Sequence, residues 1–284
     1  YKRQVYTLDL PPLPEMFPGK NILEMYDAVS VPDNPMARPY IDPVVYCYKV
    51  KQEFGVETIA HITARDRNRL ALLSMFMTVG YAGVDGVMLV TGDHTIHSPY
   101  KVIRPVYDLD SVRMIYLARL VTDYGVDFRG KKLPYKPFFH IGAGWDPNIE
   151  AGLELIRIKR KIKAGAEFFE SQAIFDIKPV VELLKTIKGA GIDVPLMLCL
   201  IPVYKLKELK FMPKLGVKVS KEYLDKILEI KDDPVKCREY SVNYLAVMAE
   251  EAAQVYDRIG YYIGSHGGFD LAEELTKEIK SRVG

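Results

Sequence analysis

The sequence has little of what marks a disulfide framework, a metal site or a membrane span. Its three cysteines (Cys47, Cys199 and Cys237) are far apart, odd in number and without C-x-x-C spacing, so neither a disulfide frame nor a structural zinc site is indicated. No apolar run approaches the ~20 residues that a membrane helix needs, and the first residues, YKRQVYTLDLPP, lack the apolar core of a signal peptide. We therefore expect a protein of the reducing cytoplasm that does not enter the membrane.

The histidines offer no stronger metal motif. His94 and His97 have a metal-like spacing only if they lie on a helix, and Pro99 close behind them predicts a loop. No Ser-His-Asp order or nucleophile elbow is present either. We expect no metal at this place and no serine-hydrolase chemistry.

Charge of either sign is not in excess. The formal net charge is +2 on 284 residues, which gives no strong field for nucleic acid or for an anionic membrane. The stretch from Lys205 to Lys226 is rich in lysine, but its lysines alternate with apolar residues. We interpret it as solvated helix and loop faces, with a partner-docking patch as the weaker alternative.

What the sequence does have is enough apolar residues for a large core. Nearly half of the residues are apolar and about a quarter are charged, as in soluble globular proteins. One domain over residues 1–284 is expected, because single (β/α) barrels commonly reach ~250 residues.

Eight short segments are apolar or β-branched and end at Pro, Gly, Asp or Asn, which is typical of strands. They are residues 4–12, 25–34, 57–64, 86–93, 137–144, 168–176, 195–202 and 258–268. Segments with helical periodicity lie between them. In residues 66–83 the predicted apolar stripe is Leu70, Leu73, Met77 and Tyr81, and residues 110–125 and 149–167 behave likewise, with glycine at the expected C′ position.

Apolar strands that alternate with amphipathic helices predict parallel strands covered by helices. Eight repeats of this unit predict an α/β fold, a closed (β/α)8 TIM barrel. A doubly wound open sheet is the competitor, but it usually has a G-x-G-x-x-G turn after its first strand, and none is present here.

In such a barrel, functional residues gather at the C-terminal ends of the strands. The strand-end residues are Asp9, Pro11, Asp33, Asn34, Thr63, Arg65, Asp66, Thr91, Asp93, Trp145, Gln172, Asp176, Pro202 and residues 265–268. The glycines of the last segment, GSHGG, permit close approach of the backbone to a phosphate or a substrate tail.

Several of these strand ends lie in motifs that are similar to those of a known family. HITARDRNRLALLS (61–74) and VMLVTGDH (87–94), followed by PVYDLDSVRMI (105–115), KRKIKAGAEFFESQAIFD (159–176) and GIDVPLMLCLIPV (191–203), resemble in the same order the patterns of the methylenetetrahydrofolate reductase family, especially its short anaerobe-type members. The resemblance implies a flavoprotein oxidoreductase of one-carbon metabolism. It would bind FAD across the strand ends, take electrons from NAD(P)H or another reduced donor, and deliver hydride to methylenetetrahydrofolate.

The resemblance also implies roles for single residues. Asp93 matches an acid near the flavin ring, where its charge would modulate the reduction potential; the structural alternative is an Asp that caps a turn. His61 matches a flavin-contact position, with ordinary packing as the alternative. Lys161 matches a residue that holds the phosphate or ribose side of the flavin. Gln172 matches a folate-contacting amide, which offers both a donor and an acceptor to the pterin edge.

Thr63 and Thr91, at the ends of their strands, complete the expected cofactor-binding set together with Glu154, which occupies a family Asp position. Asp66, in the block RDRNR, is placed as a helix cap. Arg65 and Arg67 are expected either to pair with acids or to hold an anionic part of the cofactor or substrate, and Arg69 is expected to pair structurally.

The first strand departs from the family. Members carry a glutamate three residues before a Pro-Pro pair, and that acid protonates N10 of the folate. Here the aligned residue is Leu8. Asp9 is adjacent, but neighbouring strand residues point to opposite faces. We hypothesise that Glu170, on the inward face that it shares with Gln172, takes over as the acid, because burial raises a carboxyl pKa; a buried ion pair, for instance with His140, is the alternative.

Two further departures affect the cofactor contacts. Pro32 stands where the family usually has Thr, and the fifth strand ends in Trp145, which could stack on the flavin adenine or on a nicotinamide or else pack on its own scaffold. The first hypothesis for function is a flavin-dependent reductase. The second is a flavin- or pterin-binding homologue without reductase activity that works as a subunit of a larger complex, and a methyltransferase is a weaker third. A homo-oligomer is a possible assembly.

Overall fold

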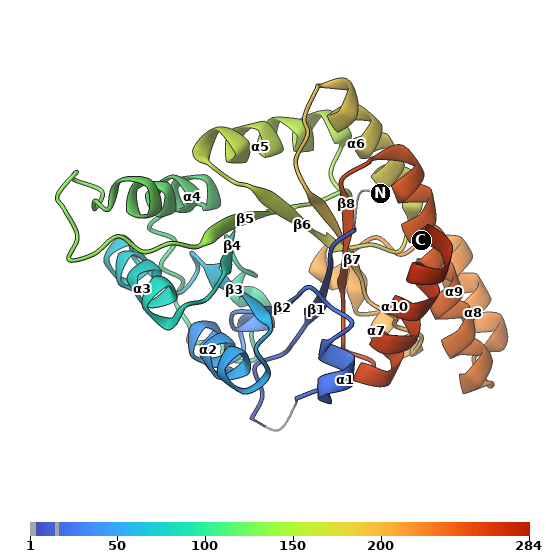
Figure 1. Ribbon diagram of the computed structural model, residues 1–284. Coiled ribbons are helices and arrows are strands. Elements are labelled where there is room, and N and C mark those ends of the chain that lie inside the picture. The colour runs from blue at the N-terminus through green and yellow to red at the C-terminus, as the bar shows by residue number, and fades with distance from the viewer. Residues whose placement is uncertain (1–3, 15–16) are drawn as a thin grey trace. The chain divides into compact units, whose positions relative to one another are not determined.

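The computed structural model describes residues 4–14 and 17–284. Its strands close into one parallel barrel in sequence order (Figure 1), so the (β/α)8 barrel predicted from the sequence is confirmed. The strands are β1 (Tyr6–Asp9), β2 (Ala28–Val31), β3 (Glu57–Thr63), β4 (Gly86–Val90), β5 (His140–Trp145), β6 (Phe168–Ala173), β7 (Leu196–Leu200) and β8 (Ile259–Ile263).

The strands are shorter than the segments that predicted them. β1 ends before Pro11 and β7 ends before Pro202, since proline has no N–H for the ladder. β4 ends at Val90, and Gly92 just beyond it has a left-handed φ of 88°. Each strand otherwise falls inside its predicted segment, except that β5 includes Trp145 as its last residue.

Helices and single helical turns fill the connections. They are α1 (Lys20–Leu23), η1 (Pro35–Ala37), α2 (Pro43–Phe54), α3 (Arg69–Ala82), η2 (Thr95–His97), α4 (Ser111–Arg119), η3 (Leu120–Tyr124), α5 (Ala151–Ala164), α6 (Ile177–Gly189), α7 (Leu206–Leu209), η4 (Met212–Leu215), α8 (Lys221–Ile230), α9 (Pro234–Val255) and α10 (Phe269–Val283). The C′ glycines predicted after two of them are found at Gly125 and Gly165, both with positive φ. None of the helices in the described residues combines the length and the apolar character of a membrane crossing.

The apolar stripe predicted for α3 is wrong in part. Leu73 is buried, but Leu70 and Tyr81 are 69% and 89% exposed. The buried face is formed by Leu72, Leu73, Phe76 and Val79. The segment is apolar on several sides, so the 3.6-residue period allows two overlapping stripes, and the contacts of α3 with its neighbours decide between them.

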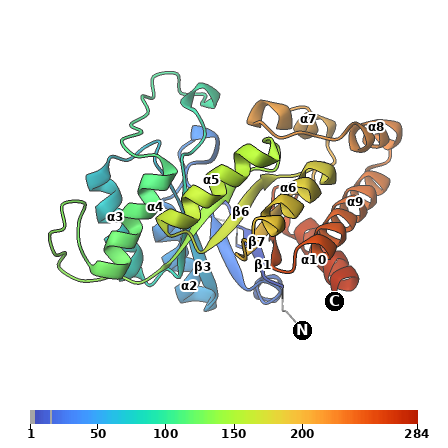
Figure 2. The ribbon, with the colours of Figure 1, turned by 90° about the horizontal axis from the view of Figure 1, so that it is seen from above.

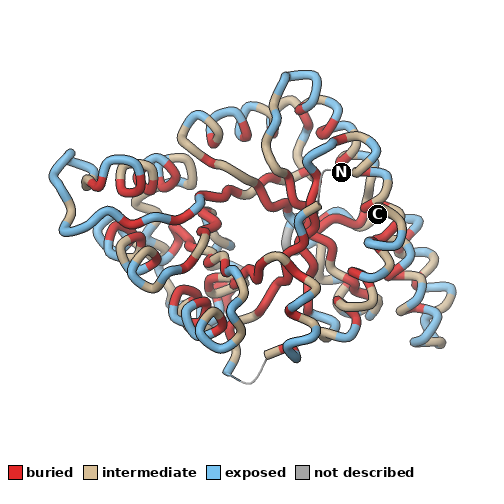
Figure 3. The backbone as a smooth tube through the Cα atoms, viewed as in Figure 1, coloured by how far each residue is buried: buried red, intermediate tan, exposed pale blue. Residues whose placement is uncertain are grey.

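The chain divides into two compact units. The first unit comprises residues 4–8, 145–157 and 170–284, and the second comprises residues 9–14, 17–144 and 158–169. In the first unit α9 and α10 lie side by side (Figure 2). In the second unit α2 packs on β3 and on α3. In each unit the buried residues follow the strands, and the exposed residues follow the outer sides of the helices (Figure 3).

Candidate functional site

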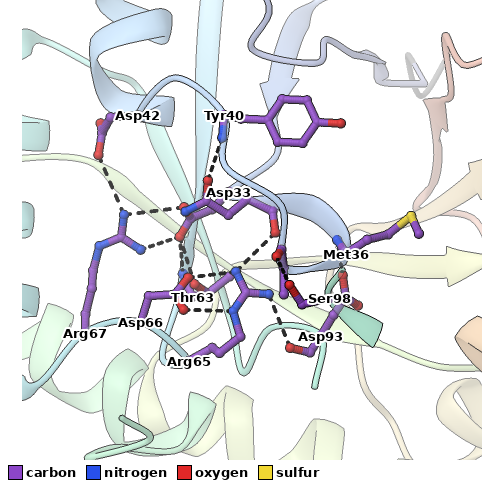
Figure 4. A network of polar contacts seen from close by, with 12 residues as sticks. Asp33, Met36, Tyr40, Asp42, Thr63, Arg65, Asp66, Arg67, Asp93 and Ser98 are labelled. Atoms are coloured by element: carbon purple, nitrogen blue, oxygen red, sulfur yellow. Dashed lines mark hydrogen bonds and ion pairs between the residues drawn. The ribbon is translucent and has the colours of Figure 1, made fainter. Parts of the chain in front are cut away.

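The ends of β2, β3 and β4 are joined by a polar network inside the second unit (Figure 4). At its centre the buried carboxylate of Asp33, just after β2, accepts both the backbone N–H and the hydroxyl of Thr63 at 2.9 Å. Arg67 donates to the same carboxylate and lies 3.6 Å from Asp42. Because the Thr63 hydroxyl donates its hydrogen bond to Asp33, it can offer a ligand only its oxygen lone pairs, as an acceptor.

Arg65 forms the second part of this network. Its side chain is 1% exposed, and its guanidinium donates to both oxygens of Asp66 at 2.9 and 2.7 Å. The same group donates to the carbonyls of Asn34 and Asp93 at 3.1 and 3.2 Å. Burial by itself would raise the pKa of Asp66, but the hydrogen bonds and charge of Arg65 outweigh it and hold that pKa below its ordinary value. Arg65 thus ties the segments after β2, β3 and β4 together.

The expectation that Asp66 caps α3 is wrong. The N-cap is Asn68, whose side chain accepts the N–H of Ala71 at 2.9 Å. The carboxylate of Asp66 instead accepts hydrogen bonds from Arg65. The other arginines of the block are also paired: Arg67 with Asp33, and Arg69 with Asp108 at 2.8 Å. Structural pairing therefore accounts for the unusual density of charge in RDRNR.

The segment after β2 is strained. Asn34, Met36 and Ala37 have left-handed φ values of 44°, 56° and 52°, which non-glycine residues adopt only when their surroundings impose it. The surroundings are hydrogen bonds: Met36 N–H donates to Asp93 Oδ2 at 2.7 Å, and Ser98 donates to the carbonyl of Ala37 at 2.8 Å. Asp93 is exposed, and it holds this segment in place.

His61, Thr91 and Gly92 complete the strand ends of the second unit. His61 is half-buried in β3, and its Nε2 lies 2.8 Å from the hydroxyl of Ser30 in β2. Thr91 is exposed, and its carbonyl accepts the N–H of Arg65 at 3.0 Å. A Cβ on Gly92 would lie 2.9 Å from the Cβ of Thr63, so the T-G-D turn needs glycine both for its φ and for this close approach.

Lys161 lies at the end of β5 in the same unit. The residue is 5% exposed, and its ammonium donates to the carbonyl of Gly144. A buried cation at a strand end is costly unless hydrogen bonds or a negative charge compensate it. The hydrogen bond to Gly144 is one such compensation.

Trp145 and Glu154 belong to the first unit. The indole of Trp145 is 2% exposed, and its N–H donates to the carbonyl of Met197 in β7 at 3.3 Å. The carboxylate of Glu154 is fully buried, accepts the N–H of Asp146 at 3.0 Å and pairs with Arg157 at 2.9 Å. Both side chains thus brace the turn between β5 and α5.

Glu170 and Gln172 lie on β6, two residues apart and on the face that they share with Phe168. The ring of Phe168 fills the space beside Gly142, where a Cβ would lie only 2.4 Å from it. Glu170 is 2% exposed, whereas Gln172 is exposed and its Oε1 accepts the N–H of Ala173 at 3.0 Å. His140, which the sequence suggested as a partner for Glu170, lies 3.4 Å from Glu167.

β1 has an orientation that the sequence did not reveal. Tyr6 packs against Tyr261 of β8, and Lys280 of α10 lies over its ring at 4.7 Å. Tyr261 points the same way, since its hydroxyl donates to Ala249 of α9. Alternation along the strand puts Leu8 on this helix-facing side and puts Asp9, which is 4% exposed, on the other side.

The structure thus has Thr63, Thr91 and Asp93 at or just beyond the ends of β3 and β4, with His61 two residues before the end of β3, while Trp145 and Glu154 lie at the turn between β5 and α5. Sequence reasoning missed Ser30, the partner of His61, and the bracing role of Arg65. An arginine that follows a buried strand directly was the available signal, because an arginine there must find several acceptors.

Comparison with known proteins agrees with these motifs. The family model for methylenetetrahydrofolate reductase matches residues 29–258. Methylenetetrahydrofolate reductase 1 of Schizosaccharomyces pombe is 22% identical over 245 residues, which are 83% of this chain and 37% of that protein. The 5,10-methylenetetrahydrofolate reductase of Pectobacterium carotovorum is 26% identical over 171 residues, which are 60% of this chain and 52% of that protein.

The chain therefore spans about a third to a half of the length of these two relatives. Among solved structures, a Clostridium thermocellum protein described as binding two copies of 5-methyl-5,6,7,8-tetrahydrofolic acid shares the fold, with a TM-score of 0.67, 17% identity and coverage of 99% of this chain and 96% of that chain. With the family match extending from β2 to the residue before β8, the chain belongs to the methylenetetrahydrofolate reductase family.

Proposed function

We propose that this protein reduces methylenetetrahydrofolate to methyltetrahydrofolate, with FAD as the hydride carrier and NAD(P)H or another reduced compound as the electron donor. The observation that carries the proposal is the family match over residues 29–258. In the overall reaction the methylene carbon gains a hydride and its bond to N10 of the folate breaks, N10 takes a proton, and the donor loses two electrons. The ligand of the Clostridium thermocellum protein, a methylated reduced folate, supports the substrate class.

The side chains of the second unit suit FAD in their chemistry. Thr63, Thr91 and Asp93 at adjacent strand ends, with His61 inside β3, give hydroxyl, carboxylate and imidazole groups that suit the polar edge of a flavin ring. Lys161 would meet the phosphate or ribose side. When bound, FAD would supply a two-electron carrier. The chain's own contribution is to orient it and to set the charge near its ring through Asp93.

Trp145 and Glu154 enter the proposal in a secondary role. The indole N–H of Trp145 is committed to Met197, so any contact with the adenine or nicotinamide would be made by an edge or face of its ring. Glu154 is committed to Asp146 and Arg157. Its contribution to cofactor binding would be to fix the turn that carries Trp145.

Substrate recognition is assigned to Gln172. Its Oε1 accepts a backbone N–H, and its amide nitrogen has no partner among residues 4–14 and 17–284. The exposed amide can therefore donate to an acceptor on the pterin edge. Its position at the end of β6 places this donor at the rim where barrel enzymes bind their substrates.

The proton for the folate nitrogen is assigned to Glu170, a buried carboxyl on the same strand face as Gln172. Asp9 provides a second buried carboxyl, on the side of β1 opposite to Leu8. Leu8 was the feature that favoured a binding subunit without reductase activity. The acid at the next position, on the other side of the strand, supports the reductase over this alternative.

The first test is the visible spectrum of the purified full chain, followed by anaerobic mixing with methyltetrahydrofolate. A yellow protein whose flavin is bleached by methyltetrahydrofolate is the expected result. A colourless protein that takes up no added FAD would refute the cofactor assignment. A yellow protein that stays oxidised would support the binding-subunit alternative.

A further inference from the structure

The connection between β7 and α8 carries a charge that the proposed reaction does not use. Residues 201–221 contain six lysines (Lys205, Lys207, Lys210, Lys214, Lys218 and Lys221) and one acid, Glu208, which is a net charge of +5 on a chain whose total is +2. All six lysines are exposed. We call these residues the lysine segment. Charge of a single sign concentrated in this way attracts anions.

The lysine segment is fixed beside the ends of β5 and β6 in the first unit. Val219 forms a parallel bridge with Phe175, and Ser220 N–H donates to the carbonyl of Phe175 at 3.3 Å. Lys218 reaches the segment after β5, where its backbone N–H and its ammonium donate to the side chain and the carbonyl of Asn148 at 3.2 and 2.6 Å. Phe175 lies three residues beyond Gln172, so the lysines follow the same strand-end edge as the proposed pterin contact.

Most of this charge is not neutralised within the protein. Lys205 has one long contact with Glu208, at 4.0 Å. Among the described residues, Lys207, Lys210, Lys214 and Lys221 make no ion pair, although Lys214 lies over the ring of Phe211. A solvated helix face usually intersperses both signs. The lysine segment instead leaves several ammonium groups available to an external anion.

The geometry points to a carboxylate subsite: we propose that the lysine segment binds the glutamate tail of a folate-type ligand whose pterin lies at Gln172. This inference rests on the proposed function. A tetrahydrofolic acid ends in a glutamate with two carboxylates, and each further γ-linked glutamate adds one more. Flexible ammonium groups suit such a tail, since lysine acts as a point charge that follows a mobile partner.

The test compares two ligands on the full chain, 5-methyltetrahydrofolate with one and with three glutamates, by calorimetric titration. Wild-type protein is expected to bind the triglutamate about tenfold more tightly at low salt, and added salt should reduce this ratio. In the triple variant K207Q/K210Q/K214Q the ratio should fall close to one. The matched control K185Q/K188Q/K277Q removes the same charge from α6 and α10 and should leave the ratio unchanged.

Each remaining outcome decides a separate point. A wild-type ratio of one, or a ratio that survives the triple variant, overturns the subsite, while the proposed function stands if the monoglutamate still binds and still bleaches the flavin. Failure of both ligands to bind the wild type overturns the proposed function together with the subsite. A free tri-γ-glutamate peptide that binds as tightly as the triglutamate ligand would show a general anion surface, and would overturn the assignment to a substrate tail.

Discussion

The carboxylate of Asp93 accepts the backbone N–H of Met36 at 2.7 Å, which joins the segment after β4 to the strained segment after β2. Asp93 therefore has two possible roles, one in holding the loop and one in setting the charge near a cofactor. They use different properties of the side chain. The hydrogen bond needs an acceptor oxygen, whereas the electrostatic role needs a negative charge.

Asp93→Asn and Asp93→Ala separate these roles. Asn keeps an acceptor for Met36, so its free energy of unfolding should stay near that of the wild type, while Ala should lose about 1 kcal/mol. Both changes remove the charge and should raise the reduction potential of the bound flavin, because a negative charge disfavours electron uptake. Urea unfolding and a spectroscopic redox titration measure the two effects. An unchanged potential in both variants would leave Asp93 with the loop role alone.

Arg65 should be the costliest single truncation in the polar network. Arg65→Met leaves the Asp66 carboxylate and the carbonyls of Asn34 and Asp93 without their buried donor, and should lower the free energy of unfolding by about 3 kcal/mol. Arg65→Lys should recover only part of this loss, since an ammonium lacks the planar fork.

Arg113→Met on α4 is the matched control for Arg65. Its side chain is 72% exposed and pairs with Asp110 only at 4.0 Å, so the change should stay within about 0.5 kcal/mol of the wild type. Chemical denaturation of the three variants gives the comparison. Equal losses in Arg65→Met and Arg113→Met would contradict the bracing role of Arg65.

Stability should fall with acid through carboxyls whose pKa is depressed in the folded state. Burial opposes the depression at Asp66 and Glu167, but Arg65 at the first, and the N–H of Ile141 with Arg119 at the second, outweigh it. Between the folded and unfolded pKa values the unfolded chain binds more protons, so the free energy of unfolding rises with pH there. The contribution is complete above the ordinary values of 3.8 for Asp66 and 4.5 for Glu167, and it is lost as the pH drops below them.

Urea unfolding between pH 3 and pH 6 tests this acid dependence. Asp66→Asn removes one of these groups and should flatten the slope below about pH 4. Asp225→Asn, an exposed carboxyl on α8, should leave the slope as it is in the wild type. If Asp66→Asn leaves the slope unchanged, carboxyls other than Asp66 control the loss of stability in acid.

The acid assignment is tested by Glu170→Gln and Asp9→Asn. If Glu170 delivers the proton, its variant should lose about 10²- to 10⁴-fold in turnover and lose the pH dependence of the wild type, while keeping the flavin spectrum. Asp9→Asn should then be affected far less. The reverse order would transfer the acid role to Asp9, and full activity in both variants would exclude both carboxyls.

Much of the fold could be predicted because the spacing of apolar residues along the chain indicates each strand and helix. All eight strand segments were found, since continuous apolar runs bounded by Pro and Gly need no long-range information. The face of α3 was mispredicted because Leu70 and Tyr81 satisfy the helical period as well as Leu72 and Phe76 do. Only the contacts of the helix distinguish the two stripes.

The candidate site was also predictable in part: its residues could be predicted from the sequence, but their partners could not. The motifs placed Thr63, Thr91, Asp93 and Gln172 at strand ends and His61 inside its strand, and the structure has them there. The partners of the charged side chains were not predictable, because Asp33 and Arg67, or Asp93 and Met36, are far apart in the sequence. Long-range pairing depends on which loops the barrel brings together.

The sequence by itself determined that parallel strands alternate with helices, and it determined the family, because both reside in the order and spacing of residues along the chain. Only the tertiary structure decided that Asp9, and not Leu8, lies on the side of β1 away from α9 and α10, and that Arg65 braces three segments instead of awaiting a ligand. The physical reason is that a strand has two equivalent faces and a guanidinium has several donors. Which face is buried, and which acceptors are met, is settled by neighbours that the local sequence does not contain.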